Sequence, residues 1–330
     1  MKVLVTDMRH SKAVEEEKVF KGTGLELDTT FSSNEDELIA NGRGAFGFLV
    51  SYANVTRRVM EALPELKVIV KYGIGVDTID LKAATDSGKY VVNLPDYCSE
   101  EVALQALGFI LNGIRMIPFF SEKVKAGVWQ GDPEPIIRYR LSQEAIGFVG
   151  FGRIARLLAR YVEPMVGKIL FFDPYLPDSA VNSKRYERVS NLESLFSQSR
   201  IVSVHAPLTK ENKGFIGRSA IANGKDVILV NTSRGSLVDP DAVAMGLDRG
   251  MIGFFGTDVA WQEPLDFNDP LTKRLLSDPR VQITPHVGWC SAESARSARR
   301  LAAEEVLRTY RGEVPLNVVN QEVLAKLGKK

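Results

Sequence analysis

The chain has 330 residues, a formal net charge of +1 and a hydrophobic fraction of 45%. This length and apolar content favour two domains with sizeable cores, and the near-neutral charge gives no bulk attraction to nucleic acid or to an anionic membrane. Two cysteines cannot form a disulfide framework, and no cysteine or histidine cluster predicts a metal site. The chain begins as a strand rather than as a signal peptide, and it has no bilayer-length apolar run. We therefore expect a cytoplasmic protein.

The first third of the chain alternates strand-like and helix-like patterns. Short apolar runs predict strands at residues 3–5, 25–27, 46–50, 68–70 and 90–92. Helical spacing predicts helices at residues 11–20, 34–40, 56–62 and 81–87. Strands that alternate with helices in this way are typical of a parallel, doubly wound sheet.

A glycine-containing loop, Tyr72-Gly73-Ile74-Gly75, follows the fourth predicted strand. Ligands of open α/β sheets bind beyond the carboxyl ends of the strands, so this loop could offer backbone amides to a small anion. Its spacing alone also allows a turn that only connects two elements. A polar segment with a proline comes later, at residues 95–99, and we place the first crossing between domains there. A long helical pattern at residues 100–117 follows it.

Residues 145–175 carry the strongest functional signal. An apolar run meets Gly150-Phe-Gly152-Arg-Ile-Ala155, a helical pattern follows, and a second apolar run ends at Asp173. This order is typical of a Rossmann unit, because Gly150 allows a tight turn and Gly152 leaves room for the pyrophosphate of a dinucleotide. The pyrophosphate would lie at the positive end of the helix. Asp173 would accept hydrogen bonds from the ribose and would repel a 2′-phosphate, which favours NAD over NADP.

The alternation continues to the end of the chain. Further strands are predicted at residues 201–204, 227–230, 253–255 and 281–284, and helices at residues 192–197, 218–222 and 241–248. Together with the Rossmann unit, these elements predict a six-stranded nucleotide-binding domain. A final amphipathic helix is predicted at residues 292–310, and residues 315–320 are expected to be extended.

Three polar residues each follow a predicted strand of this domain: Arg234, Glu263 and His286. The carboxyl ends of parallel strands share one edge of a sheet, so we expect the three side chains to gather there. A guanidinium binds a carboxylate through two parallel hydrogen bonds, and an imidazole can exchange a hydroxyl proton while a carboxylate holds its other nitrogen. Taken singly, the same residues also fit a surface arginine, a loop glutamate and a turn histidine. This chemistry needs no metal.

Several motifs in order give the whole chain a likeness to one family. These motifs are Gly73-Ile-Gly75-Val-Asp77, Val149-Gly-Phe-Gly-Arg-Ile154, Val204-His-Ala-Pro-Leu-Thr209, Val230-Asn-Thr-Ser-Arg-Gly235, Asp258-Val259 through Glu263-Pro264, and Thr284-Pro-His286. With them, the sequence resembles the D-isomer-specific 2-hydroxyacid dehydrogenases, which interconvert a small D-2-hydroxy acid and its 2-oxo acid with NAD. By this resemblance, His286 is the acid/base, Glu263 is its partner and Arg234 binds the substrate carboxylate.

The resemblance also implies which other residues contact ligands. For His205, the alternative to a cofactor contact is simple packing. For Trp289, the alternative to a substrate contact is a core position at the hinge. The implied substrate contacts, besides Arg234, are Tyr72, Gly73, Ile74, Gly75 and Trp289. The implied cofactor contacts are Gly150, Gly152, Arg153, Ile154, Asp173, His205, Ala206, Pro207, Thr232 and Asp258.

The family's architecture is an α/β fold with two doubly wound parallel-sheet lobes. A Rossmann cofactor domain, here residues 98–292, is inserted into a flavodoxin-like substrate domain, here residues 1–97 and 293–330. The resemblance further implies a homodimer formed through the cofactor domain and a small 2-hydroxy or 2-oxo acid as the partner. From the net charge we expect neither nucleic acid nor membrane as a partner.

Some stretches resemble a narrower branch that is similar to the C-terminal-binding-protein corepressors: Leu94-Pro-Asp-Tyr-Cys-Ser-Glu-Glu-Val-Ala103, Asp173-Pro-Tyr-Leu-Pro-Asp178, and His286-Val-Gly-Trp289 with Glu293-Ser294. This likeness leaves an NAD(H)-sensing scaffold with little turnover as an alternative to an enzyme. Leu104 and Gln105 stand where the family usually has an acidic residue and a histidine, so their role stays open. Glyoxylate, hydroxypyruvate, 3-phosphoglycerate and bulkier oxo acids all fit the same three residues.

Overall fold

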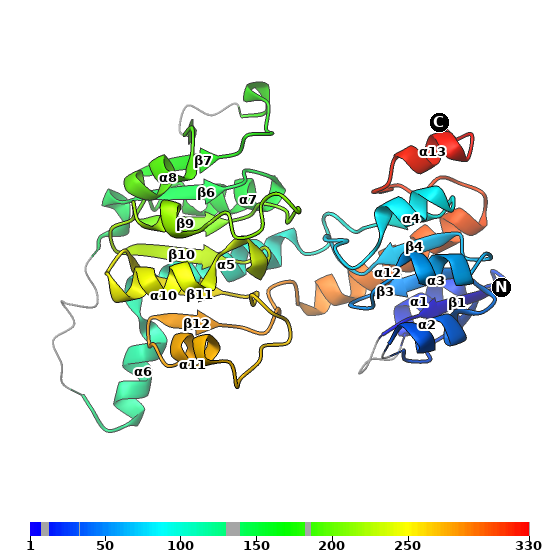
Figure 1. Cartoon of the computed structure of the whole chain (residues 1–330), viewed down its shortest axis with the longest axis horizontal. Coiled ribbons are helices and arrows are strands. Elements are labelled where there is room, and N and C mark those ends of the chain that lie inside the picture. The colour runs from blue at the N-terminus through cyan, green and yellow to red at the C-terminus, as the bar shows by residue number, and fades with distance from the viewer. Residues whose placement is uncertain (8–12, 33, 130–138, 182–185, 330) are drawn as a thin grey trace. The chain divides into compact units, whose positions relative to one another are not determined.

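The computed structural model describes residues 1–7, 13–32, 34–129, 139–181 and 186–329 (Figure 1). Its internal contacts divide the chain into two compact units, Met1–Cys98 with Cys290–Lys330, and Ser99–Trp289. The expected boundaries, 1–97 with 293–330 and 98–292, fall near this division. The second unit is thus inserted into the sequence of the first. The expected α/β class with two doubly wound parallel sheets is confirmed.

The first unit has a five-stranded sheet in which every strand pair is parallel. Its strand order is β2-β1-β3-β4-β5, the flavodoxin-like order. The strands are short and mostly buried on both faces, as parallel strands covered by helices must be. Their bounds are β1 (Lys2–Val5), β2 (Glu26–Asp28), β3 (Ala45–Val50), β4 (Val68–Lys71) and β5 (Tyr90–Val92).

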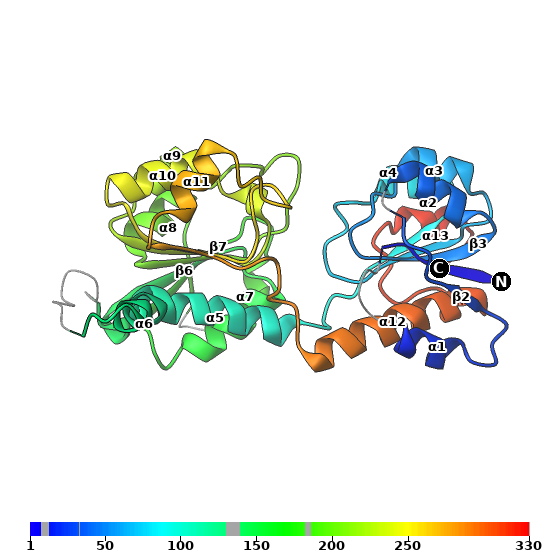
Figure 2. The same cartoon turned by 90° about the horizontal axis from the view of Figure 1, so that it is seen from below.

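Helices cover both faces of this sheet (Figure 2). On one face lie α1 (Val14–Phe20) and α12 (Ala292–Tyr310), and on the other lie α2 (Glu35–Gly42), α3 (Arg57–Ala62) and α4 (Leu81–Asp86). The short helix α13 (Glu322–Lys326) lies beside α4, and its Val323 packs into the same core cluster as α12. Part of the helix expected at residues 11–20 falls outside the described residues. The segment expected to be extended at residues 315–320 makes one antiparallel bridge, from Val318 to Val92.

The second unit has a seven-stranded, wholly parallel sheet in the order β12-β11-β10-β9-β6-β7-β8. The six-stranded expectation was wrong, because Tyr186–Arg188 adds an edge strand whose residues are only partly buried and carry no apolar run. The central strands follow the Rossmann order. Their bounds are β6 (Ala145–Val149), β7 (Lys168–Phe172), β8 (Tyr186–Arg188), β9 (Ile201–Val204), β10 (Val227–Asn231), β11 (Ile252–Thr257) and β12 (Val281–Ile283).

Two helix layers enclose the second sheet (Figure 2). One layer holds α5 (Ser99–Arg115), α6 (Ile117–Lys125) and α7 (Arg153–Val162). The other holds α8 (Leu192–Gln198), α9 (Arg218–Ile221), α10 (Pro240–Asp248) and α11 (Pro270–Leu276). Short 3-10 turns occur at η1 (Leu141–Gln143), η2 (Asp178–Ala180) and η3 (Gly235–Leu237).

The single helix expected at residues 100–117 ends early, because Met116 has a φ of 50° and breaks the α-helical path between α5 and α6. Among the described residues, no single helix has the length and hydropathy needed to cross a membrane. The α5–α6 pair, bent by 61°, meets that requirement only when its two helices are counted together.

A buried lysine helps to close the first unit. Lys89 lies just before β5 and is 3% exposed, and its Nζ donates to the carbonyl oxygens of Leu63 and Leu66, each at 3.0 Å. Leu63 directly follows the end of α3, and its carbonyl also accepts the backbone N–H of Leu66 at 3.2 Å. Burial lowers the pKa of Lys89, with a smaller contribution from the charge of Lys67.

We expect Lys89→Met to lower the free energy of unfolding of the first unit by about 1–3 kcal/mol, because the buried carbonyls of Leu63 and Leu66 each lose a hydrogen bond from the ammonium. Urea unfolding followed by hydrogen–deuterium exchange in peptides from Met1–Cys98 observes this unit separately. Lys82→Met is the matched control, since Lys82 is exposed and only pairs with Asp86 on the surface. Unchanged or greater stability in the Lys89 variant would show that the cost of burying the ammonium outweighs its hydrogen bonds.

Candidate active site

Three neighbouring strands of the second unit deliver the three predicted side chains to one edge. Arg234 follows β10, Glu263 follows β11 and His286 follows β12, and these strands are adjacent in the sheet. Nδ1 of His286 lies 2.8 Å from Oε2 of Glu263, while Oε1 of Glu263 accepts the backbone N–H of Ala260 at 3.0 Å. The carboxylate is therefore fixed at both oxygens, and one of them orients the imidazole.

The charges around Glu263 favour its ionised form. Burial alone would raise the pKa of Glu263, but the hydrogen bond and charge of His286, the N–H of Ala260 and the charge of Arg234 outweigh it, so the pKa is lowered. Because Nδ1 of His286 faces a carboxylate, that nitrogen carries a proton. Nε2 makes no hydrogen bond among the described residues, and the side chain is 33% exposed, so this nitrogen is available for a proton transfer.

The backbone of His286 is itself unusual. Its φ of 54° lies in the left-handed region, which costs a residue other than glycine about 1–3 kcal/mol and persists only where the surroundings enforce it. Here the N–H of His286 donates to the carbonyl oxygens of Asp258 (2.8 Å) and Thr284 (3.0 Å). The segment that presents the imidazole is therefore held against the end of β11.

The side chain of Asp258 completes this clamp. The residue is 3% exposed. Its Oδ1 accepts the hydroxyl of Thr284 at 2.5 Å and the N–H of Val287 at 3.0 Å, and its Oδ2 accepts the N–H of Gly288 at 2.7 Å. A buried carboxylate with these three partners can be kept at low cost. The carboxylate of Asp258 thus accepts the N–H groups of the two residues that follow His286, and the cofactor contact expected of Asp258 stays a prediction.

Asn231 forms the turn that carries Arg234, a role that the sequence reasoning missed. It is fully buried at the end of β10, where its side chain accepts the N–H of Ser233 at 3.0 Å and donates to the carbonyl of Arg234 at 2.9 Å. Gly235 follows, and a Cβ at this position would lie 1.8 Å from the carbonyl oxygen of Ala260. An asparagine at a strand end is a typical turn former, so Asn231 was a readable signal.

The predicted dinucleotide turn lies between β6 and α7. Gly150 has a φ of 79°, and a Cβ there would lie 2.8 Å from the backbone nitrogen of Ala206, so both conformation and space require glycine. Among the described residues, no atom beyond the chain neighbours lies within 4 Å of the Cβ position of Gly152, and no side chain caps the start of α7, where Arg153 and Ile154 form the first turn. A helix start without a capping side chain suits a pyrophosphate.

Asp173 follows β7, beside this turn. Its Oδ2 accepts the N–H of Phe151 at 2.9 Å, and its Oδ1 accepts those of Tyr175 (3.0 Å) and Leu176 (3.1 Å). A carboxylate offers about four acceptor positions, so one position is left for a ribose hydroxyl. Arg188 of β8, another residue that the sequence reasoning missed, donates to the backbone carbonyls of Asp173 and Leu176.

Two further predicted cofactor contacts follow β9 and β10. His205 bonds the hydroxyl of Ser203 through Nε2 at 2.8 Å, and burial lowers its pKa to about 3, so the ring stays neutral. Ala206 and Pro207 come next, and the hydroxyl of Ser233 donates to the carbonyl of Ala206. The Thr232 hydroxyl is covered and has no hydrogen-bond partner among the described residues. This orphaned hydroxyl and the open turn at Gly152 fit a bound dinucleotide.

The predicted substrate loop belongs to the first unit and follows β4. Tyr72 donates its hydroxyl to Oε1 of Glu16 at 2.6 Å, and burial together with this carboxylate raises the pKa of Tyr72 well above its usual value. The carbonyls of Gly73 and Ile74 accept from Leu94 N (3.0 Å) and the Asn93 side chain (2.7 Å). Trp289, at the end of the second unit, is partly buried. The substrate roles of this loop and of Trp289 stay predictions.

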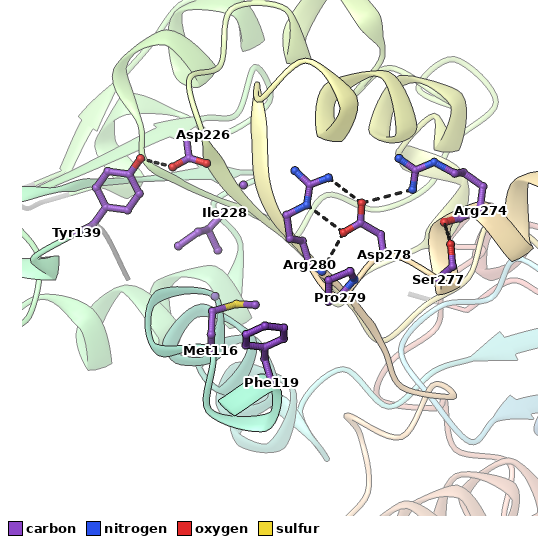
Figure 3. Close-up of a pocket in the computed structure, with 12 residues that line it drawn as sticks. Met116, Phe119, Tyr139, Asp226, Ile228, Arg274, Ser277, Asp278, Pro279 and Arg280 are labelled. Carbon is purple, nitrogen blue, oxygen red and sulfur yellow. Dashed lines mark hydrogen bonds and ion pairs between the residues drawn. The ribbon is translucent and has the colours of Figure 1, made fainter. Parts of the chain in front are cut away.

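A cavity of about 460 Å³ lies elsewhere in the second unit (Figure 3). It is lined by residues at the amino ends of β10, β11 and β12, such as Asp226, Gly253 and Arg280. Figure 3 shows Arg274 and Arg280 turned toward Asp278, with nitrogen–oxygen distances of 3.4 and 2.7 Å. Its position, opposite the edge that carries His286, separates this cavity from the candidate active site.

Known proteins match both the fold and the motifs. Residues 107–288 match the family model for the D-isomer specific 2-hydroxyacid dehydrogenase, NAD binding domain. The chain is 34% identical to the D-3-phosphoglycerate dehydrogenase of Methanocaldococcus jannaschii, over 99% of this chain but only 62% of that protein. It thus spans less than two-thirds of the length of that relative. It is 35% identical to the glyoxylate reductase of Korarchaeum cryptofilum, over 82% of this chain and 81% of that protein.

One solved structure is similar along almost the whole chain. It is the D-lactate dehydrogenase of Aquifex aeolicus, complexed with NAD and lactic acid, with a TM-score of 0.81, 25% sequence identity and 98% coverage of both chains. As its motifs predicted, the chain belongs to the family of D-isomer-specific 2-hydroxyacid dehydrogenases, and it carries that family's NAD-binding domain.

Proposed function

We propose that the chain interconverts a small D-2-hydroxy acid and its 2-oxo acid with NAD as the hydride carrier. The observation that carries this proposal is the 2.8 Å contact between Nδ1 of His286 and Glu263, with Arg234 on the next loop along the sheet edge. The names of the relatives agree with this reaction class. A proton donor, its anionic partner and a carboxylate-binding cation are the protein groups that the reaction requires.

Each of the three side chains has one role in the mechanism. The guanidinium of Arg234 binds the substrate carboxylate and so fixes the orientation of the 2-carbon. Nε2 of His286 gives a proton to the 2-oxo oxygen during reduction and takes the hydroxyl proton during oxidation. Glu263 keeps the other proton of the ring on Nδ1 and stabilises the imidazolium. NAD, when bound, supplies or accepts the hydride.

The edge of the second sheet supports NAD as the cofactor. In this proposal, the amides at Gly152, Arg153 and Ile154 hold the pyrophosphate, and Asp173 holds the ribose. The residues that follow β9 and β10 line the path toward His286. The remaining proposed cofactor contacts are Gly150, His205, Ala206, Pro207, Thr232 and Asp258.

We propose Tyr72, Gly73, Ile74, Gly75 and Trp289 as the other substrate contacts. Backbone amides of a glycine loop suit a carboxylate, and an aromatic wall suits the apolar part of a small oxo acid. Of the two relatives described above, one is named for 3-phosphoglycerate and the other for glyoxylate. Small 2-oxo acids are therefore the substrates to test first.

We also propose a homodimer formed through the cofactor domain. Apolar side chains on and after α6 support it: Ile117 and Val124 are exposed, and Trp129 is 85% exposed. Single exposed apolar residues are common, but several on one segment favour an interface. The net charge of +1 gives no support for nucleic acid as a further partner.

The first test is NADH oxidation with a panel of 2-oxo acids from glyoxylate to phenylpyruvate. We expect turnover of at least one member by the wild-type protein. His286→Gln should lower kcat by about 100-fold or more, because the proton donor is lost. Arg234→Gln should mainly weaken binding of the 2-oxo acid, so that the rate no longer saturates with substrate concentration. Both variants should still bind NADH, measured by fluorescence. Tight NADH binding by the wild-type protein without any turnover would support the NAD(H)-sensing scaffold instead.

The second test concerns the pH dependence. Since the pKa of Glu263 is lowered, its carboxylate persists as the pH falls below the ordinary glutamate range and is lost only at the lower, folded-state pKa. The rate of reduction should therefore fall only at acidic pH, where Glu263 becomes protonated. In Glu263→Gln no carboxylate holds Nδ1 of His286, so this acidic fall should disappear from the pH profile, with an activity loss of about tenfold or more at neutral pH.

Asp266→Asn is the matched control for Glu263→Gln, because it neutralises an exposed carboxylate of the same loop that only caps the N–H of Asn268. It should leave the pH profile of kcat unchanged. An unshifted profile in Glu263→Gln would contradict the role given to Glu263.

The third test concerns the choice between NAD and NADP. Two like charges about 4 Å apart repel by about 1–4 kcal/mol near a protein surface, so Asp173 should discriminate against a 2′-phosphate. We expect Asp173→Asn to raise the ratio of kcat/KM for NADPH over NADH by about tenfold or more. The amide oxygen of asparagine can still accept the N–H groups of Tyr175 and Leu176. A ratio equal to that of the wild type would contradict the argument from charge.

A further inference from the structure

Gln105 of α5 makes a side-chain hydrogen bond to the segment that carries His286. Its Nε2 donates to the hydroxyl of Thr284 at 3.0 Å, across almost the whole length of the second unit's sequence. Thr284 comes two residues before His286, directly after β12. The sequence had left the role of Gln105 open, and this contact gives it a position at the edge of the candidate active site.

The hydrogen bonds along this path have a fixed direction. The hydroxyl of Thr284 has a single proton, and it gives that proton to Oδ1 of Asp258 at 2.5 Å. The same hydroxyl must then accept, so it faces the amide N–H of Gln105 rather than the amide oxygen. The path runs from amide to hydroxyl to carboxylate, and only a donor at position 105 completes it.

Asp258 connects the hydrogen-bonded path from Gln105 and Thr284 to the backbone around His286. Its two carboxylate oxygens accept the N–H groups of Val287 and Gly288. Gly288 also packs tightly against Gln105, because a Cβ at Gly288 would lie 3.0 Å from Cγ of Gln105 and 2.7 Å from Oδ2 of Asp258. Gln105 thus contacts this segment twice, once by hydrogen bonding and once by packing.

We propose that Gln105 is a positioning residue for His286, acting through Thr284 and Asp258 to hold the left-handed backbone that presents the imidazole. The kinetic part of this inference rests on the proposed function, while the structural part does not. Without the amide donor, the Thr284 hydroxyl turns away from Asp258 in part of the population. The hydrogen bonds that Asp258 accepts from the N–H groups of Val287 and Gly288 then weaken, and the imidazole leaves its productive position.

The structural test is hydrogen–deuterium exchange of peptides that cover residues 284–289, which needs no turnover. Gln105→Leu keeps the bulk of the side chain but removes the donor, and Gln105→Glu replaces it with an acceptor. In both variants, we expect the amide hydrogens of this segment to exchange several-fold faster than in the wild type. Leu104→Ala is the matched control, since Leu104 is the exposed neighbour on the same helix, and it should exchange at the wild-type rate.

In the kinetic test, each rate is divided by the fraction of active protein, which is measured as the fraction that binds NADH. We expect kcat for 2-oxo acid reduction to fall by about tenfold in Gln105→Leu, since a small misplacement of a catalytic group has a large effect on rate. The KM for NADH should stay constant, and the solvent isotope effect on kcat should rise because proton transfer becomes more limiting. A purely structural role would lower the active fraction and the melting temperature without changing the isotope effect.

Two outcomes would overturn the proposal. The first is wild-type exchange of residues 284–289 in both Gln105 variants. The second is faster exchange with an unchanged, fraction-corrected kcat and isotope effect in a wild-type protein that turns over. If the wild-type protein has no turnover with any 2-oxo acid, the proposed function fails, and the exchange measurement alone then decides whether Gln105 holds the segment.

Discussion

The candidate active site depends on a buried carboxylate that keeps a histidine in an unfavourable backbone conformation. His286 has a positive φ, and Asp258 provides both a carbonyl for its N–H and a carboxylate for the two amides that follow. The register of the sheet makes this possible, because Thr257 pairs with Ile283 and so brings Asp258 beside Thr284 at the next position. Strain at a reactive residue persists only where the surroundings enforce it, and here the surroundings are one side chain and one strand pairing.

The same principle extends along the edge of the second sheet, where each loop is tied to the loop of a neighbouring strand. The Asp173 carboxylate binds the N–H of Phe151, and the Ser233 hydroxyl binds the carbonyl of Ala206. The N–H of Asp258 binds the carbonyl of Asn231. Parallel pairing alone brings strand ends together but leaves their loops free. These side-chain and backbone bonds give the loops one relative position, which a bound dinucleotide and a reacting substrate both require.

The sequence predicted those parts whose signal is local. Buried strands, the glycine turn and the positions of Arg234, Glu263 and His286 after three strands follow from apolar runs and spacing, so the edge that gathers them could be inferred. The strand at Tyr186–Arg188 has no apolar run and exists because β7 offers it an edge. The break at Met116 depends on a single backbone angle. Gln105 has a role that appears only when distant segments meet, because its partner Thr284 is far away in the sequence, and no spacing rule reports such a contact.

Two histidines at the same edge show how environment, rather than residue type, assigns the chemistry. His205 lies beside Phe148 and, among the described residues, bonds a serine hydroxyl, and desolvation lowers its pKa to about 3, which favours the neutral ring near neutral pH. His286 has a carboxylate at one nitrogen, an open position at the other and one-third of its side chain in solvent. An acid/base group must gain and lose a proton during each turnover. A buried ring without an anionic partner cannot hold the charged state, so among the histidines of the described residues only His286 fits the role.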